Sequence, residues 1–257
     1  MTRREALAVA VGVALFAGLA VDSLRRSSAT YDEPAHLSAA WTHLALHDYR
    51  LSPDHPPLVK SLAAVPLLFQ DVRMDEADES WTEHAIWRFA RRWLYQWNDA
   101  DRLLFWGRLP IVALAASLAV AVFLWTRARL GRGAAFVAFF LAVLSPDLLA
   151  HGQLVTTDLG AAAFVFLAVA AFDAALERTT PVRVLLAGAA LGAALATKFS
   201  ALGLFPILLA VAAARVLDPR PLVLRLHGER VVQGRAARTA ALLALLAALA
   251  PVAVLVI

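Results

Sequence analysis

The sequence predicts an all-α polytopic membrane protein with about seven transmembrane helices. Apolar residues make up 61% of the 257 residues and charged residues only 17%, which is too little charge for the surface of a water-soluble domain. Long apolar runs recur along the chain, each close to the roughly 20 residues that a helix needs to cross a bilayer. Arginines gather in every second segment between these runs, and so on one side of the expected bilayer.

We expect each long apolar run to form one span of a single membrane domain over residues 1–257. The expected spans are residues 5–24, 103–125, 134–149, 159–176, 184–197, 201–216 and 240–257. The first lacks a convincing small-residue cleavage site and many apolar runs follow it, so we interpret it as a retained span and not as a signal peptide. The fifth and sixth meet at Thr197-Lys198-Phe199-Ser200, where we expect a tight turn near one membrane face.

The placement of arginine predicts the orientation of these spans. With a cytoplasmic N-terminus, the cytoplasmic segments hold the arginines of residues 3–4, 127–132, 178–183 and 215–238. The opposite short loops hold no arginine and only Lys198. We therefore expect a multi-pass protein of the inner (plasma) membrane. Because the arginines flank apolar runs instead of forming one stripe, nucleic acid is not an expected partner. The chain has no cysteine, which excludes disulfides and thiol chemistry.

Residues 25–101 form a long first extracytoplasmic loop that holds all three tyrosines and five of the seven tryptophans. Two stretches of it, residues 33–47 and 80–97, carry apolar side chains at helical spacing. The second stretch would present a stripe of Trp87, Ala90, Leu94 and Trp97. We expect both to be amphipathic helices on the outer membrane surface, with a shorter apolar helix over residues 58–69 between them.

The acids Asp32 and Glu33 follow the first span, and Asp158 begins the fourth. Each acid has two interpretations. It either caps the start of a helix, or it acts beside the membrane as a general base or an ion ligand. Because the predicted topology puts Asp32 and Asp158 on the same face, the two acids could converge on one site.

Two cations and a set of histidines are further candidates. Lys198 is costly so near the bilayer, which favours a phosphate partner, although snorkelling to the head groups is the alternative. Arg108, just inside the second span, carries the same argument more weakly. The histidines His36, His43 and His47 lie near one side of the first loop helix. Their spacing permits a metal site, but ordinary hydrogen-bonding histidines are the more common case.

Short motifs with functional residue types follow one another over residues 22–206. In chain order they are Tyr31-Asp32-Glu33-Pro34-Ala35-His36, Asp48-Tyr49-Arg50-Leu51-Ser52-Pro53-Asp54-His55-Pro56-Pro57-Leu58, Arg108-Leu109-Pro110, Ser145-Pro146, His151-Gly152-Gln153-Leu154-Val155-Thr156-Thr157-Asp158 and Ala196-Thr197-Lys198-Phe199-Ser200. In order, spacing and expected membrane face, the set resembles the phospholipid-carrier-dependent glycosyltransferases of the C-type fold. These include the protein O-mannosyltransferases and the aminoarabinose transferases that modify lipid A.

The resemblance implies transfer of a sugar from a polyprenyl-phosphate carrier to an acceptor protein, lipid or envelope glycan on the extracytoplasmic face. It implies Asp32 as the general base, Glu33 as its support or as a residue that positions the substrate, and Asp158 near the acceptor or an ion. The remaining residues that it places at the substrate are Lys198, Arg108, His55, His36, Lys60 and His151. No cofactor is certain, and a divalent metal stays open because family members differ in metal dependence.

Members of this family have more spans than this chain, whose last apolar run continues to Ile257. We therefore expect it to be the N-terminal part of such an enzyme. One alternative is a transporter or flippase for lipid-linked sugars, which would show broken helices and polar residues near mid-membrane. A second is a non-catalytic membrane assembly subunit. The gathering of the acids at one outer face favours the enzyme.

Overall fold

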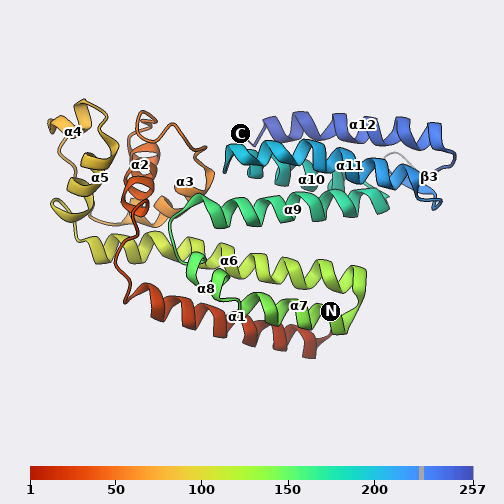
Figure 1. Cartoon of the computed structure of the whole chain (residues 1–257), viewed down its shortest axis with the longest axis horizontal. Coiled ribbons are helices and arrows are strands. Elements are labelled where there is room, and N and C mark those ends of the chain that lie inside the picture. The colour runs from red at the N-terminus through yellow and green to blue at the C-terminus, as the bar shows by residue number, and fades with distance from the viewer. Residues whose placement is uncertain (226–228, 257) are drawn as a thin grey trace. The chain divides into compact units, whose positions relative to one another are not determined.

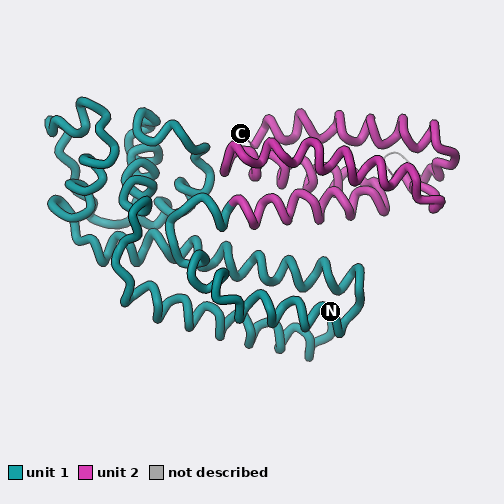
Figure 2. Tube along the Cα trace, in the orientation of Figure 1, with its two compact units in different colours: residues 1–160 teal, residues 161–257 magenta. Residues whose placement is uncertain are grey.

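A computed structural model of the chain describes residues 1–225 and 229–256. The protein is mostly helical, at 73% of residues. Its residues form two compact units, unit 1 (residues 1–160) and unit 2 (residues 161–257), which Figure 2 marks in different colours.

The helices and strands follow one another as in Figure 1. Unit 1 holds α1 (Arg3–Leu24), α2 (Glu33–Ala45), α3 (Leu58–Ala64), the 3-10 helix η1 (Val65–Phe69), α4 (Glu79–Thr82), α5 (Ile86–Tyr95), α6 (Ala100–Leu130), α7 (Arg132–Val143), α8 (Pro146–His151) and the start of α9 (Thr157–Glu177). Unit 2 holds the rest of α9, then β1 (Arg178–Thr179), α10 (Pro181–Leu195), η2 (Phe199–Gly203), α11 (Leu204–Leu217), β2 (Leu222–Arg225), β3 (Glu229–Val232) and α12 (Arg235–Val254).

Within residues 1–225 and 229–256, five helical segments are long and apolar enough to cross a membrane: α1, α6, α9, η2 with α11, and α12. The surface of α1 agrees with this. Leu7, Val11, Leu15 and Leu19 recur every fourth residue and are all exposed. A continuous stripe of exposed leucine and valine is unfavourable in water and suits contact with lipid. These features are those of a multi-pass membrane protein.

Two of the expected spans are too short to cross alone. The helix α7 has 12 residues and α10 has 15. At 1.5 Å per residue they reach roughly 18 and 22 Å, against about 30 Å of hydrocarbon. The third expected span, residues 134–149, breaks where Ser145 caps the separate helix α8 by accepting a hydrogen bond from the Leu148 N–H. Seven full-length spans are therefore not confirmed.

In unit 1, α1, α6 and α7 pack together around the fully buried rings of Phe16, Phe123 and Phe139. A buried acid fixes one end of this bundle. Glu5 near the start of α1 is 3.2 Å from Arg127 of α6 and 3.2 Å from Arg132 of α7. The start of α1 and the turn between α6 and α7 therefore lie at the same end of the unit.

The loop between α1 and α6 differs from the expected pair of surface helices. The helix α2 packs against α3, η1 and α5, and most of its side chains are buried, so it is a core helix and not a surface one. The expected helix over residues 80–97 is two helices, α4 and α5, separated at His84 with φ 54°. The buried residues of α5 are Phe89, Ala90, Trp93 and Leu94, whereas Trp87 is 51% exposed. The rings of Phe89 and Trp93 pack into the protein, so the buried face of α5 differs from the predicted stripe. The short apolar helix over residues 58–69 is confirmed as α3 and η1.

Unit 2 is a helical bundle whose core contains Phe172, Leu191, Leu204 and Leu249. The helices α10 and α12 pack closely because α10 presents glycine. A Cβ atom on Gly188 would lie 2.6 Å from Val252 Cβ, and one on Gly192 would lie 2.6 Å from the Ala253 carbonyl oxygen. The two glycines are four residues apart, the small-residue spacing that lets membrane helices approach.

Unit 2 also contains a small sheet that the sequence analysis missed. Its order is β1-β2-β3, with β1 parallel to β2 and β2 antiparallel to β3. In the part of the chain that the structure describes, the strands are short, from 2 to 4 residues. Runs this short, broken up by arginine, give no clear alternating pattern in the sequence. The fold is mostly helical, as predicted, and this small sheet is an addition that the prediction did not include.

Candidate functional site

A fully buried ion pair lies where α2 meets α6. Glu33 of α2 and Arg108 of α6 both have fully buried side chains. Arg108 Nε donates to Glu33 Oε1 over 2.9 Å, and one terminal nitrogen donates to Oε2 over 2.7 Å. Its other bonds go to the carbonyl oxygens of Leu24, Ser27 and Ser28 at 2.8–3.0 Å. These bonds use all five N–H groups of the guanidinium.

Glu33 also fixes two segments without regular structure. Its carboxylate accepts from the Thr30 N–H at 2.9 Å and from the Val155 N–H at 3.0 Å. Burial alone would raise the pKa of Glu33, but the Arg108 guanidinium and the two backbone N–H groups hold that pKa below its usual value. Glu33 is therefore ionised at neutral pH and joins α2, α6 and the segments before α2 and α9.

The buried ion pair bears on the expected roles of Arg108 and Glu33. Arg108 was expected to hold a carrier phosphate, but its donors are all used and its side chain is fully buried. A phosphate could reach it only by breaking the ion pair. Arg108 is thus a positioning residue, and the expectation is corrected. Glu33 is fully buried and presents no exposed oxygen to a substrate, and its support of Asp32 stays a prediction.

Asp32 differs from its neighbour in every respect. It is exposed and occupies the N-cap position of α2, but its backbone is helical and its side chain does not cap the helix. The alternative that Asp32 serves as a cap is therefore wrong. Its carboxylate makes no hydrogen bond or ion pair with the part of the chain that the structure describes. The result is an exposed acid on a backbone that the neighbouring Glu33 holds rigid.

His36, one turn along α2 from Asp32, is a neutral group beside the acid. Its ring stacks on the His55 ring with centroids 5.5 Å apart. Burial first, then the charges of Lys60 and His55, lower the pKa of His36 to about 4, against the opposing charges of Asp32 and Asp54. Its Nδ1 atom is buried without a hydrogen-bond partner. At neutral pH the ring therefore carries no charge that would pair with Asp32.

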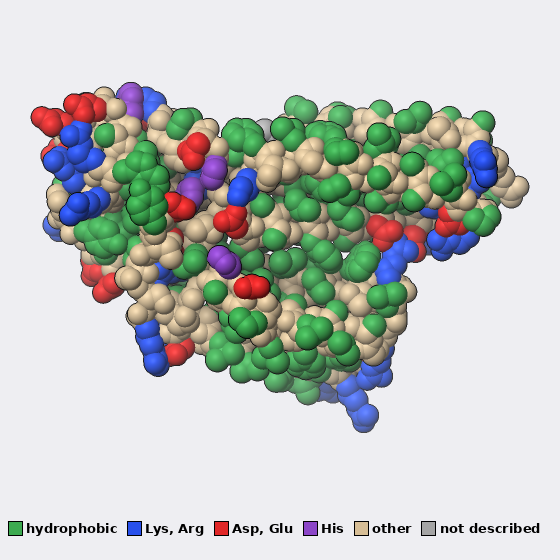
Figure 3. Space-filling model, viewed as in Figure 1, with side chains coloured by type: hydrophobic (Ala, Val, Ile, Leu, Met, Phe, Trp, Pro, Cys, Tyr) green, Lys and Arg blue, Asp and Glu red, His purple; other side chains and the backbone are tan. Residues whose placement is uncertain are grey.

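A buried lysine holds the loop before α3. Lys60 Nζ donates to the Ser52 carbonyl at 2.9 Å and to Ser52 Oγ at 3.1 Å. Ser52 has φ 53°, and its hydroxyl donates to Asp54 Oδ1 at 2.9 Å. Burial lowers the pKa of Lys60 to about 8. Sequence reasoning did not select Ser52 and Asp54, although both stand in the motif that contains His55. Figure 3 shows histidine and acidic side chains gathered beside α2 and α3.

The other expected site residues lie in two places. His151 is exposed at the end of α8, and Asp158 is exposed in the first turn of α9, three residues after the Val155 that binds Glu33. Because Val155 donates to Glu33, the neighbour of Asp32, the segment that leads into Asp158 is attached to the segment that holds Asp32. Lys198 is half-buried at the start of η2 in unit 2. The convergence of Asp158 with Asp32 and the phosphate partner of Lys198 both stay predictions.

The histidines do not form the three-residue arrangement that their spacing permitted. His43 is buried, with Nε2 3.3 Å from the Leu51 carbonyl and its ring stacked on Tyr49. His47 lies beyond the end of α2, at φ 54°. Within residues 1–225 and 229–256, no group of three or more histidine, aspartate or glutamate side chains is placed to hold a metal.

Comparisons of the chain with models of protein families, with characterised proteins and with solved structures give no match.

Proposed function

We propose that the protein is an integral membrane glycosyltransferase, or the N-terminal part of one. It transfers a sugar from a polyprenyl-phosphate carrier to an acceptor on the extracytoplasmic face. The observation that carries the proposal is the contrast within one dipeptide. Glu33 is buried and fully bonded, while Asp32 is exposed and unbonded among the described residues. A general base needs a free carboxylate in a fixed position, and this pair of acids supplies both.

In the proposed reaction, a hydroxyl oxygen of the acceptor attacks the anomeric carbon of the sugar. Asp32 takes the hydroxyl proton as the new C–O bond forms. The bond from the sugar to the carrier breaks, and the carrier phosphate leaves with the bonding electrons. Because the attack comes from the face opposite the leaving group, the sugar inverts. The neutral His36 favours this step, since a cation there would pair with Asp32 and weaken it as a base.

The leaving phosphate needs cations near the membrane surface. Every N–H donor of Arg108 is bonded to Glu33 or to a backbone carbonyl, so Lys198 is the proposed phosphate ligand. Asp158 is the proposed second acid, near the acceptor or an ion. His55, Lys60 and His151 shape the loops around the sugar. In this scheme the buried Lys60 acts through Ser52 and does not contact the substrate.

The test measures sugar transfer from a radiolabelled polyprenyl-phosphate sugar by membranes that carry the protein. We expect Asp32→Asn to lower the transfer rate at least about a hundredfold, as loss of a general base does. The control is Asp22→Asn, because Asp22 is another exposed acid, near the C-terminal end of α1, and it pairs with Arg26. Unchanged transfer by a normally inserted Asp32→Asn protein would remove the base assignment.

A second candidate is a transporter or flippase of lipid-linked sugars, and one observation favours it. The third expected span is broken, because α7 ends at Val143 and the separate short helix α8 begins at Pro146 and is followed by Gly152. A Cβ on Gly152 would lie 3.2 Å from the Phe16 ring and 2.9 Å from Ala115 Cβ, within the lengths of α1 and α6. Broken helices at membrane depth are typical of transporters. Movement of the lipid-linked sugar across sealed vesicles without transfer to an acceptor would support this candidate over the enzyme.

A further inference from the structure

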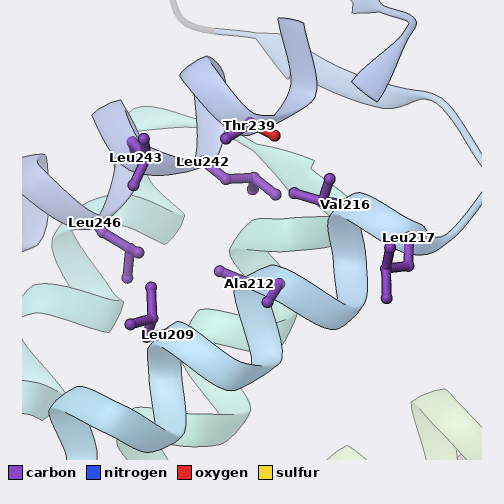
Figure 4. Close-up of a pocket in the computed structure, with 9 residues that line it drawn as sticks. Leu209, Ala212, Val216, Leu217, Thr239, Leu242, Leu243 and Leu246 are labelled. Carbon is purple, nitrogen blue, oxygen red and sulfur yellow. The ribbon is translucent and has the colours of Figure 1, made fainter. Parts of the chain in front are cut away.

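An apolar groove of about 310 Å³ lies between α11 and α12, wholly within unit 2 (Figure 4). Leu209, Ala212 and Val216 line it on α11, and Leu242 and Leu246 line it on α12. Val216 and Thr239 lie at one end of the groove, and Leu209 and Leu246 lie toward the other. Exposed leucines border it, including Leu217 and Leu243. From Leu209 to Leu217 the groove runs about 12 Å along the helix, enough for part of an acyl chain.

The end of the groove at Thr239 is polar and basic. Thr239 is its single polar lining residue, and its hydroxyl donates to the Arg235 carbonyl at 2.9 Å. Arg235 precedes Thr239 by one helical turn, on the same face of α12, and is exposed. Its side chain has no partner within the described residues. An exposed cation thus stands at the mouth of the groove.

Two further arginines at this end are held in place by hydrogen bonds to backbone carbonyl oxygens. Arg215 precedes the lining residue Val216 and donates to the carbonyls of Arg220 and Pro221 at 2.9 and 2.8 Å. Arg238 precedes Thr239, is 7% exposed, and donates to the carbonyls of Asp218 and Arg220. Both guanidinium groups therefore converge on the Arg220 carbonyl from opposite walls of the groove.

The acids near this end do not neutralise it. The Asp218 carboxylate is bound by Arg220 at 2.6 and 2.8 Å, and Glu177 is the other acid whose charge acts on Arg215. Asp173 is a third acid, whose charge acts on Arg220. Against these three acids stand four arginines, Arg215, Arg220, Arg235 and Arg238. The basic end therefore carries an excess of positive charge next to an apolar groove.

We propose that this groove is a binding site for an anionic phospholipid. One acyl chain lies along α11 and α12, and the phosphate lies between Arg215 and Arg235. An apolar slot that ends in positive charge matches a lipid, which joins an apolar chain to an anionic head, and not a soluble anion. Arg215 is ordered before the lipid arrives, so little side-chain freedom is lost on binding. The site uses no residue of the proposed glycosyltransferase chemistry.

The experiment is native mass spectrometry of the purified full chain, released from micelles that contain equal amounts of phosphatidylglycerol and phosphatidylcholine with identical acyl chains. We expect phosphatidylglycerol to be retained about tenfold over phosphatidylcholine. The Arg215→Gln, Arg235→Gln double variant should retain both lipids equally. Its control is Arg91→Gln, which removes an exposed arginine of α5 outside the groove.

A second pair of variants tests the groove itself. Ala213→Phe fills it, whereas Ala214→Phe adds the same side chain to an exposed neighbour outside the lining. We expect Ala213→Phe to reduce lipid retention severalfold and Ala214→Phe to leave it unchanged, with both proteins eluting like the wild type. Equal retention of the two lipids by the wild type overturns the proposal. It is also overturned if Ala213→Phe changes the oligomeric state without reducing lipid retention, since a second copy of the chain would then be the occupant.

Discussion

The two units hold their helices together by different means. Unit 1 uses buried charge, with Glu33 and Arg108 at one end of α6 and Glu5 with two arginines at the other. Unit 2 uses close approach of backbones, because Gly188 and Gly192 let α10 touch α12. Both solutions suit a low-dielectric environment, where unpaired charge is costly and small residues allow tight packing.

The two means of packing attach different parts of the chain. The Glu33 ion pair binds the irregular segments before α2 and α9 as well as two helices. A buried ion pair adds little net stability, but it fixes geometry, because breaking it leaves an unpaired buried charge. In unit 2 the glycine contact joins two helices along their lengths and fixes no loop. Unit 1 is accordingly the unit in which a chemical site can be kept rigid.

The largest expected effect comes from Arg108→Met. It leaves the Glu33 carboxylate buried without its cation and should lower the free energy of unfolding by about 3–5 kcal/mol. All seven tryptophans lie in unit 1, so tryptophan fluorescence during thermal unfolding in micelles reports on this unit. The Glu33→Gln, Arg108→Met double variant should regain part of the loss. A single variant as stable as the wild type would show that the ion pair does not hold unit 1.

The next effect is a pH dependence that belongs to unit 1. The pKa of His36 is about 4 in the folded protein and 6.5 without the fold, so the unfolded chain takes up the proton first as the pH falls. Stability is therefore present above pH 6.5 and is lost between pH 6.5 and about 4, by at most about 3 kcal/mol. The fluorescence midpoint should fall across that window, and less steeply in His36→Gln. The exposed His47→Gln serves as the control. Equal slopes in both variants would contradict the buried, neutral state of His36.

The smallest effect tests unit 2. In Gly192→Ala, the new Cβ would lie 2.6 Å from the Ala253 carbonyl oxygen, and we expect a loss of about 1–3 kcal/mol. The matched control is Gly203→Ala, where a Cβ meets no atom within 4 Å. Circular dichroism follows the loss of helix on heating, and its midpoint should be lower in Gly192→Ala than in Gly203→Ala. If Gly192→Ala and Gly203→Ala unfold alike, the close approach of α10 and α12 does not stabilise unit 2.

Sequence patterns predicted the long apolar helices, because composition over some 20 residues is a strong signal. They failed where tertiary contacts decide. The stripe on residues 80–97 was misplaced because the rings of Trp93 and Phe89 pack into protein instead of toward lipid. At the site, too, the sequence predicted which residues matter but not the contacts that they make. Motifs selected Asp32, Glu33 and Arg108, but sequence alone cannot say that Arg108 uses every donor on Glu33 and three carbonyls. That result depends on segments about 80 residues apart meeting in the fold.

We propose that Asp32 acts as the general base and that the adjacent Glu33 holds the fold together. One paired measurement tests this difference most directly. Sugar transfer and the thermal unfolding midpoint are measured on Asp32→Asn and Glu33→Gln in the same membranes and micelles. We predict that Asp32→Asn lowers the transfer rate at least about a hundredfold with an unchanged midpoint, and that Glu33→Gln lowers the midpoint markedly. An Asp32→Asn protein that transfers sugar normally, or a Glu33→Gln protein with wild-type stability, would contradict the account.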